Sequence, residues 1–210
     1  MIIDCLADLH GHYPETEGGD LLIIAGDLTA NDTLEQQLKF YIWLHRQKYK
    51  HYIFIAGNHD NAIANNETFH NILANTTYLC DSGTEFEGLK VWGSPWTKQF
   101  KGMNPKCKAF TKHSEDELYE YLKLIPYDVD VLITHSPPYG ILDKTISGEN
   151  VGSLYLMGAL MYFFRPKLWV FGHVHEAYGQ ETFRDSTICV NASHVNERYA
   201  PINKPVRILL

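Results

Sequence analysis

Five short apolar runs recur along the chain, and segments with helical spacing lie between them. The runs are rich in β-branched and aromatic residues, which is typical of buried strands. They occupy residues 2–7, 21–26, 52–57, 131–135 and 168–173. Because these runs show little polar alternation, several of them are predicted to be parallel strands that are buried on both faces.

Three segments between or beside these runs are predicted helices. Residues 31–47 contain a D-x-x-E capping pattern at Asp32, and residues 114–125 open with S-x-x-E at Ser114. Both patterns precede apolar residues at helical spacing. Residues 154–164 (LYLMGALMYFF) are too few to cross a bilayer and predict a buried helix.

Two further segments, residues 84–93 and 181–190, are predicted hairpins that turn at Gly88 and Asp185. Strands that alternate with helices, with antiparallel additions, indicate the α/β class. The sequence has no internal repeat and no linker, so residues 1–210 are interpreted as one domain.

Polar residues stand at or just after the end of all five apolar runs, where ligand sites form in α/β sheets. They are Asp8 and His10, then Asp27, then Asn58, His59 and Asp60, then His135, and finally His173 and His175. One such group alone reads equally well as a turn. Five groups in one chain favour a metal site, and oxygen and imidazole donors without thiolate suit Mn, Fe or Zn.

The number of candidate ligands predicts two metal ions rather than one. Seven side chains are too many for a single tetrahedral ion, whereas two ions can share a carboxylate. The Asp-x-His and His-x-His spacings place each pair on one face of an extended backbone. Asp27 is the only donor in its segment and is therefore the expected bridge.

The amino-acid composition indicates which kind of binding partner and which cellular compartment to expect. A formal charge of −7 disfavours polymeric nucleic acid as the main partner. The first strand contains Asp4, so it does not resemble a signal peptide, and no segment predicts a membrane span. The expected location is cytoplasmic, because the four cysteines form no close pair and suit a reducing compartment: Cys5, Cys80, Cys107 and Cys189.

The ordered blocks D-x-H, G-D, G-N-H-D, T-H and G-H-x-H resemble those of the calcineurin-like metallophosphoesterases. The stretches DSGTEFEGLKVWGSPW, THSPPYGILD and FGHVHEAYGQETF are most similar to a small branch of that superfamily. The branch includes brain metallophosphoesterase-domain proteins and bacterial class III cyclic-nucleotide phosphodiesterases. This resemblance covers nearly the whole chain and implies a four-layer α/β/β/α sandwich of two mixed sheets flanked by helices.

The resemblance also implies a division of the ligands between two divalent ions, with Mn²⁺ expected first and Fe or Zn as alternatives. One ion would be held by Asp8, His10, Asp27 and His175, and the other by Asp27, Asn58, His135 and His173. His59 would face the substrate rather than a metal, with Asp60 orienting its ring.

The expected activity is hydrolysis of a small phosphoester, with a hydroxide that bridges the two ions as nucleophile. His59 would protonate the leaving oxygen or bind the phosphoryl group, and Asn58 would also contact the substrate. For His12, a phosphate contact and an exposed loop position are both open. The alternatives to a phosphodiesterase are a phosphomonoesterase, including a protein phosphatase, and a non-catalytic metal-binding scaffold of the same fold.

The arginines favour a diester substrate, with cyclic nucleotides among the candidates. Phosphomonoesterases of this superfamily typically place arginines beside the metals, because a guanidinium clamps the additional phosphoryl oxygens. None of the five blocks contains arginine. Of the arginines elsewhere, Arg184 and Arg198 are those that folding is expected to bring nearest the pocket.

Two interpretations are open for several other residues. Asp143 and Glu176 either support ligand imidazoles or are solvated loop carboxylates. Residues 94–100 (SPWTKQF) either line the mouth of the pocket or pack as an apolar staple over the sheet. Ordinary surface or core positions are expected for the remaining histidines, which are His45, His51, His70, His113 and His194.

Overall fold

The computed structural model describes residues 1–65, 74–100, 103 and 105–210. Its strands are β1 (Ile2–Leu6), β2 (Gly19–Ala25), β3 (Tyr49–Ile55), β4 (Thr76–Tyr78), β5 (Ser82–Phe86), β6 (Leu89–Ser94), β7 (Thr97–Lys98), β8 (Thr111–Lys112), β9 (Val131–Thr134), β10 (Leu168–Phe171), β11 (Gly179–Phe183), β12 (Thr187–Asn191) and β13 (Val206–Leu209). Its helices are α1 (Leu34–Arg46), α2 (Asn61–Asn65), α3 (Glu115–Leu122), α4 (Leu154–Tyr162) and a 3₁₀ turn (His175–Ala177).

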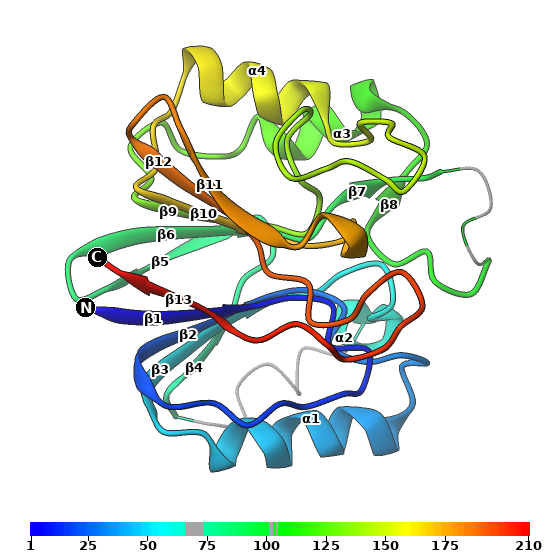
Figure 1. Cartoon of the computed structure of the whole chain (residues 1–210), viewed down its shortest axis with the longest axis vertical. Coiled ribbons are helices and arrows are strands. Elements are labelled where there is room, and N and C mark those ends of the chain that lie inside the picture. The colour runs from blue at the N-terminus through cyan, green and yellow to red at the C-terminus, as the bar shows by residue number, and fades with distance from the viewer. Residues whose placement is uncertain (66–73, 101–102, 104) are drawn as a thin grey trace.

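The strands form two large mixed sheets, and a small sheet pairs β7 with β8. The first large sheet has the order β13-β1-β2-β3-β4, and the second has the order β11-β12-β10-β9-β6-β5. The predicted parallel pairing is confirmed for β1 with β2, for β2 with β3 and for β9 with β10. The first strand also pairs with the last, β13, so both ends of the chain lie at one side of the molecule (Figure 1).

The two large sheets pack face to face, and helices cover their outer faces (Figure 1). Ile23 lies in the apolar cluster between the sheets, whereas its neighbours Leu22 and Ile24 lie in the cluster beneath α1. Alternate residues of a strand point to opposite faces, so β2 is apolar throughout because both of its faces are buried. Helices α3 and α4 cover the second sheet. The predicted four-layer sandwich is confirmed.

The start of α1 differs from its prediction by one residue. Thr33, and not Asp32, is the N-cap, and the Thr33 hydroxyl accepts a hydrogen bond from the backbone N–H of Gln36. Asp32 has a φ of 54°, outside the extended conformation that an N-cap needs. Its carboxylate instead accepts hydrogen bonds from the Gln37 amide and from the backbone N–H of Ala62. The predicted cap of α3 at Ser114 is confirmed.

Helix α4 is buried on only one face, so the prediction of a buried helix is wrong for its other face. Leu156 and Leu160 are buried against the second sheet, but Tyr162 remains 76% exposed. An apolar sequence does not reveal which side of a helix a neighbouring layer will cover. Within the part of the chain that the structure describes, no helix has both the length and the apolar character needed to span a membrane.

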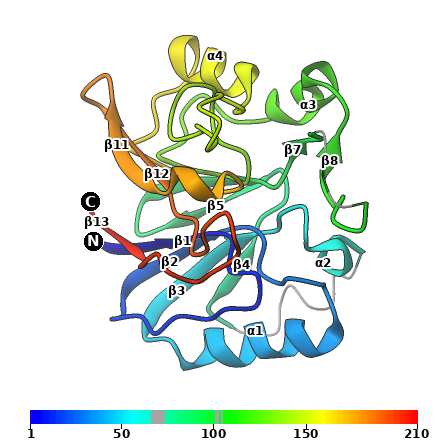
Figure 2. The same cartoon turned by 45° about the vertical axis from the view of Figure 1, so that its right-hand side comes forward.

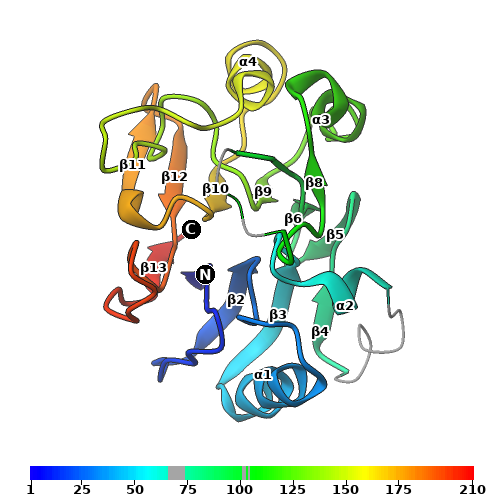
Figure 3. The ribbon, with the colours of Figure 1, turned by 90° about the vertical axis from the view of Figure 1, so that its right-hand side faces the viewer.

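The two predicted hairpins are confirmed, with β5 pairing antiparallel with β6 and β11 with β12. More important for function is the edge at which β1, β2, β3, β9 and β10 end. This edge is on the right of Figure 1, comes forward in Figure 2 and faces the viewer in Figure 3. The polar residues that follow these five strands are thus brought together from two sheets.

Candidate metal centre

Four polar side chains from three strand ends converge at this edge. The potential ligand atoms of Asp8, His10, Asp27 and His175 all lie within 4.8 Å of one another. Asp8, His10 and Asp27 are buried, and His175 is partly buried. These are the four residues that the sequence analysis assigned to one ion, and folding brings them together across a separation of up to 167 positions, from Asp8 to His175.

Asp8 is held by one carboxylate oxygen and leaves the other free for a cation. Its Oδ2 accepts hydrogen bonds from the backbone N–H of His173, at 2.8 Å, and from the Ser193 hydroxyl. Its Oδ1 is buried and has no hydrogen-bond partner within the described chain, and it lies 3.7 Å from Nε2 of His175. A buried, unpaired carboxylate oxygen is costly unless a positive charge faces it.

Two imidazole nitrogens also face each other in this cluster. Nε2 of His10 lies 3.2 Å from Nε2 of His175. Burial lowers the pKa of His10 to about 3, which keeps that ring neutral with a lone pair on one nitrogen. A neutral imidazole is the form that binds a metal ion.

Asp27 lies between this cluster and a second group of candidate ligands. Its Oδ2 is 3.5 Å from Nε2 of His10 and also 3.5 Å from Nε2 of His135. Its Oδ1 accepts a hydrogen bond of 2.9 Å from the backbone N–H of His59. One carboxylate oxygen therefore faces imidazoles from both groups, as a shared ligand would.

The second group consists of Asn58, His135 and His173. Oδ1 of Asn58 lies 3.1 Å from Nε2 of His135, and the rings of His135 and His173 have centroids 5.0 Å apart. Nδ1 of His135 lies 2.9 Å from the carbonyl oxygen of Ala25, which orients Nε2 toward Asp27 and Asn58. All candidate ligands of the sequence analysis therefore occur in two adjoining groups that meet at Asp27.

The titration of the second group reflects its burial and the charge of Asp27. Burial and the neighbouring His135 lower the pKa of His173 to about 3. Burial would also lower the pKa of His135, but Asp27 raises it to about 9. His135 must release this proton to bind a metal ion, so metal binding is coupled to proton release.

The backbone of the centre is strained where it presents its side chains. Four candidate ligands have a positive φ, which few residues other than glycine adopt: Asp8 (49°), His10 (44°), Asp27 (52°) and His173 (70°). The glycines that open two of the blocks are also required. A Cβ on Gly57 would lie 2.3 Å from Oδ1 of Asp27, and one on Gly172 would lie 2.3 Å from Oδ2 of Asp8.

His59 lies beside the centre, but Asp60 does not orient its ring as predicted. Nδ1 of His59 lies 3.0 Å from the carbonyl oxygen of Ala30, and its ring centroid is 4.5 Å from that of His10. The buried carboxylate of Asp60 instead accepts backbone hydrogen bonds from Leu28, Thr29 and Gly57, at 2.9–3.1 Å. The prediction that Asp60 orients His59 is therefore wrong. Asp60 holds the backbone of two ligand-bearing loops together.

Three other candidates take positions outside the two ligand groups. His12 is exposed, and its backbone N–H bonds to the carbonyl oxygen of Leu9. Asp143 is buried and accepts hydrogen bonds from the backbone of Gly140 and Gly152, so it braces its own loop rather than a ligand imidazole. Glu176 is exposed and accepts a hydrogen bond from the backbone N–H of Ile146, as a loop carboxylate does.

Residues 94–100 were predicted either to pack as an apolar staple or to line the pocket, and each interpretation applies to a different part of the segment. Trp96 packs on Tyr121 with ring centroids 3.8 Å apart, as a staple beside α3. Phe100 lies at the centre, with its ring centroid 5.7 Å from that of His173. Ordinary positions are found for the other described histidines, whereas His70 lies outside the described residues: His45 and His113 are exposed, His51 contacts Thr77, and His194 contacts Asn203.

Two residues at the centre are absent from the sequence predictions. Ser193 follows β12, which is parallel to β10, so the strand-end signal that found the other residues also applies to it. Tyr199 packs edge-to-face against His10 and His175, with ring centroids 4.8 and 5.2 Å away. It follows no strand directly, and nothing in the local sequence pattern marks it.

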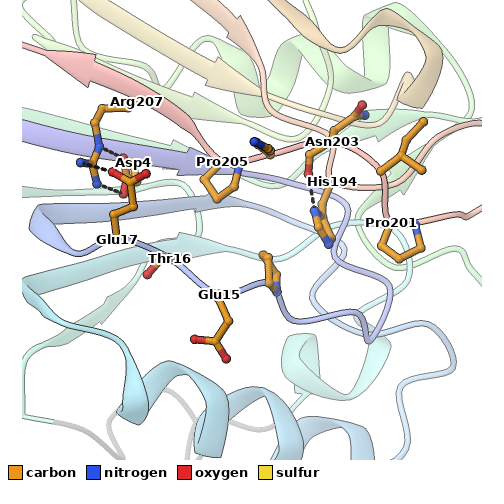
Figure 4. Close-up of a pocket in the computed structure, with 12 residues that line it drawn as sticks. Asp4, Glu15, Thr16, Glu17, His194, Pro201, Asn203, Pro205 and Arg207 are labelled. Atoms are coloured by element: carbon orange, nitrogen blue, oxygen red, sulfur yellow. Dashed lines mark hydrogen bonds and ion pairs between the residues drawn. The ribbon is translucent and has the colours of Figure 1, made fainter.

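A separate hollow of about 470 Å³ lies between the segment after β1 and the segment before β13 (Figure 4). Its guanidinium, on Arg207, bonds to both carboxylate oxygens of Asp4 at 2.8 Å and to Glu17 at 2.8 Å. An arginine saturated in this way has little capacity left for phosphate. None of the seven candidate metal ligands lines this hollow.

Comparison with known proteins agrees with the geometry of the centre. Residues 1–177 match the calcineurin-like phosphoesterase family, and the chain belongs to that family. The chain is 33% identical to metallophosphoesterase domain-containing protein 1 of Homo sapiens, over 97% of this chain and 69% of that protein. It is 30% identical to a UPF0046 protein of Caenorhabditis elegans, over 96% of this chain and 78% of that protein.

Two other similarities are more limited. A probable rhamnogalacturonate lyase C of Emericella nidulans is 36% identical, but the match covers 84% of this chain and only 17% of that protein. A solved structure superposes with a TM-score of 0.67 over 90% of this chain and 89% of that chain, at 17% sequence identity. At that identity the likeness shows the fold alone.

The residues present fit the divalent metal that the family implies. Asp8 supplies a buried oxygen without a partner in the described chain, and His10 and His175 direct ring nitrogens at the same space. Oxygen and imidazole donors are the ligands of Mn, Fe and Zn. Family membership and this cluster together indicate a metal-dependent phosphoesterase hydrolase.

Proposed function

We propose that this chain is a phosphodiesterase that uses two divalent metal ions, Mn²⁺ first among the candidates. The observation that carries the proposal is the position of Asp27, whose Oδ2 is equidistant, at 3.5 Å, from His10 and His135. Asp8, His10, Asp27 and His175 would hold one ion, and Asp27, Asn58, His135 and His173 the other. When bound, such ions neutralise phosphoryl oxygens and make the attacking water more acidic.

The protein's own residues would then orient the ester and move one proton. Asn58 belongs to the second ligand group and His59 follows it in the same loop, so both would lie beside a phosphoryl group bound at the ions. His59 protonates the leaving oxygen or donates a hydrogen bond to the phosphoryl group. The Ala30 carbonyl accepts from Nδ1 of His59, which leaves Nε2 for the substrate. His12 is not assigned a phosphate contact, because it is exposed and outside both groups.

A small diester is the proposed substrate class, with cyclic nucleotides among the candidates. Three arginines make contacts away from the ligand groups: Arg165 bonds to backbone carbonyls beside α4, Arg184 packs on Phe183, and Arg207 pairs with Asp4. Arg198 pairs weakly with Glu197 at the surface. A site without an arginine clamp suits the single negative charge of a diester better than the dianion of a monoester.

A second candidate, a phosphomonoesterase, is favoured by one observation. Residues 97–112 contain five lysines and no Asp or Glu. One residue of this segment meets the centre, because the backbone N–H of Ala109 bonds to the carbonyl oxygen of Asn58. Lys98 pairs with Glu115, and Lys112 lies over the Trp96 ring, so neither of these two points freely at the centre. The phosphodiesterase hypothesis is therefore preferred to the phosphomonoesterase hypothesis.

Kinetics on two matched esters test the proposal. The Mn²⁺-loaded protein should hydrolyse bis(4-nitrophenyl) phosphate with a higher kcat/KM than 4-nitrophenyl phosphate, and a chelator should abolish both activities. A clear preference for the monoester would favour the second candidate. Metal binding without turnover of either ester would favour a non-catalytic scaffold. We also propose that residues 1–210 form one domain, a proposal supported by the pairing of β1 with β13.

A further inference from the structure

A tyrosine in the segment between β12 and β13 lies against the metal centre. The ring of Tyr199 meets those of His10 and His175 nearly at right angles, at 79° and 85°. His59 is its third imidazole neighbour, with ring centroids 6.4 Å apart. Tyr199 therefore borders both the ligand group that contains His10 and His175 and the side chain that the proposed function directs at the substrate.

The loop that carries Tyr199 is closed as a tight hairpin. Val195 and Pro201 form an antiparallel bridge at its base. The backbone N–H of Tyr199 bonds to the carbonyl oxygen of Asn196 at 2.8 Å. The side-chain oxygen of Asn196 accepts a further hydrogen bond of 2.9 Å from the backbone N–H of Ala200. The hairpin's own bonds thus fix the residue at its tip.

The base of this hairpin is attached to the strand end that bears Asp8. The backbone N–H of His194 donates to the carbonyl oxygen of Ala7 at 2.7 Å. Nδ1 of His194 lies 2.7 Å from the carbonyl oxygen of Asn203, across the loop (Figure 4). The position of Tyr199 is therefore tied to the backbone of the metal centre rather than to a separate part of the surface.

Stability alone does not explain a tyrosine at this position. Its φ of 58° is one that a bulky residue rarely adopts, whereas glycine adopts it readily. The side chain also remains 50% exposed, so it is not placed there to fill a core. Residues held in such conformations cluster at functional sites, which points to a use for the side chain.

The hydroxyl of Tyr199 is free to donate a hydrogen bond. Within the part of the chain that the structure describes, this hydroxyl has no hydrogen-bond partner. A phenol has an ordinary pKa of about 10, and burial, followed by the charge of Asp27, raises the pKa of Tyr199. The group is therefore protonated at neutral pH and can donate to an anionic oxygen.

The loop directs this phenol, and not the neighbouring guanidinium, at the centre. Arg198 directly precedes Tyr199, but its side chain is 85% exposed and lies 3.5 Å from the carboxylate of Glu197. A neutral donor suits the single charge of a diester, whereas a guanidinium would favour the dianion of a monoester.

We infer that Tyr199 is a substrate-binding residue, whose hydroxyl donates a hydrogen bond to a non-bridging oxygen of the phosphoryl group. The inference rests on the proposed function for the identity of the substrate, a phosphodiester. With Tyr199 as the donor to the phosphoryl group, His59 is left to protonate the leaving oxygen.

Tyr199→Phe tests this role, because it removes the hydroxyl and keeps the ring against His10 and His175. In the Mn²⁺-loaded protein, kcat/KM for bis(4-nitrophenyl) phosphate should fall about 10- to 100-fold, the effect of losing one hydrogen bond to a charged group. Bound metal and the urea midpoint should stay at their wild-type values. Tyr162→Phe is the matched control, since it removes the hydroxyl of a tyrosine that is 76% exposed on α4, and it should change none of these quantities.

Titration of the Mn²⁺-loaded proteins with dimethyl phosphate gives a readout without turnover. Bound Mn²⁺ broadens the ³¹P NMR line of a phosphate that binds beside it, so the titration yields a Kd. The Kd should rise about 10-fold in Tyr199→Phe and stay unchanged in Tyr162→Phe.

Wild-type values of both kcat/KM and Kd in Tyr199→Phe would overturn the inference and leave the proposed diesterase function standing. Loss of metal or a lower urea midpoint in that variant would also overturn it, because the hydroxyl would then support the fold or the ligands. If wild type hydrolyses neither nitrophenyl ester, the proposed function fails, but a weaker affinity of Tyr199→Phe for dimethyl phosphate would still support the contact.

Discussion

Nε2 of His10 lies 3.2 Å from Nε2 of His175, although 165 residues separate them in the sequence. Both rings are largely buried, and Asp8 and Asp27 lie beside them. Two imidazole nitrogens this close require a proton or a cation between them, because their lone pairs otherwise repel. The arrangement is that of a preformed cation site.

Asp27→Ala should remove more bound metal than Asp8→Ala, and it should abolish turnover. Asp27 faces both ligand groups, so its loss removes a ligand and a negative charge from both proposed ions, whereas Asp8 faces only one. Elemental analysis of the two purified variants, beside wild type, measures the difference. Equal metal content in the two variants would count against a shared carboxylate.

His59→Ala should keep both ions and lose turnover by roughly 10²–10⁴-fold, the scale of a positioned proton donor. Its ring is turned toward the Ala30 carbonyl rather than into either ligand group, so no metal ligand is removed. Metal content and kcat are measured on the same sample. Loss of an ion from this variant would make His59 a ligand, and unchanged kcat would exclude it from proton transfer.

Asp60→Ala should destabilise the protein by on the order of 3 kcal/mol, because it leaves three buried backbone N–H groups without an acceptor. Asp60→Asn retains one acceptor oxygen and should lose less. Urea unfolding of the metal-free proteins measures both changes. Glu120→Ala is the control, because Glu120 is an exposed carboxylate on α3 and its loss should change stability by less than about 0.5 kcal/mol.

If Asp60→Ala unfolds at the same urea concentration as wild type, its hydrogen bonds to Leu28, Thr29 and Gly57 contribute little to stability. A loss of turnover in that variant would then point to a direct role beside His59. The two outcomes therefore separate the support of loops from participation in the reaction.

The positions of the buried strands along the chain and the convergence of their polar ends could be predicted from sequence, because both follow from local patterns. Apolar runs define buried strands, and parallel strands end at a common edge. The contacts of Asp60 could not be predicted, since its partners are backbone groups of another loop. Tyr199 was missed for a similar reason: only the path of the chain after β12 brings its ring to His10 and His175.

The outer face of α4 shows a second limit of the sequence. Its apolar residues predicted burial all round, but the second sheet covers only the side that carries Leu156 and Leu160. Periodicity identifies a helix and its apolar positions, whereas burial depends on how many layers the fold builds over it. The position of Phe100 shows the same limit, because the ring of a loop residue can face a sheet or a cavity.

The central claim is that two ions act together at Asp27 in diester hydrolysis. It is tested most directly by titrating Mn²⁺ into metal-free wild-type protein while following both bound metal and hydrolysis of bis(4-nitrophenyl) phosphate. We predict saturation at two ions per chain, with activity that follows occupancy of the second site. Full activity at one bound ion per chain, or saturation at two ions without any hydrolysis, would contradict the claim.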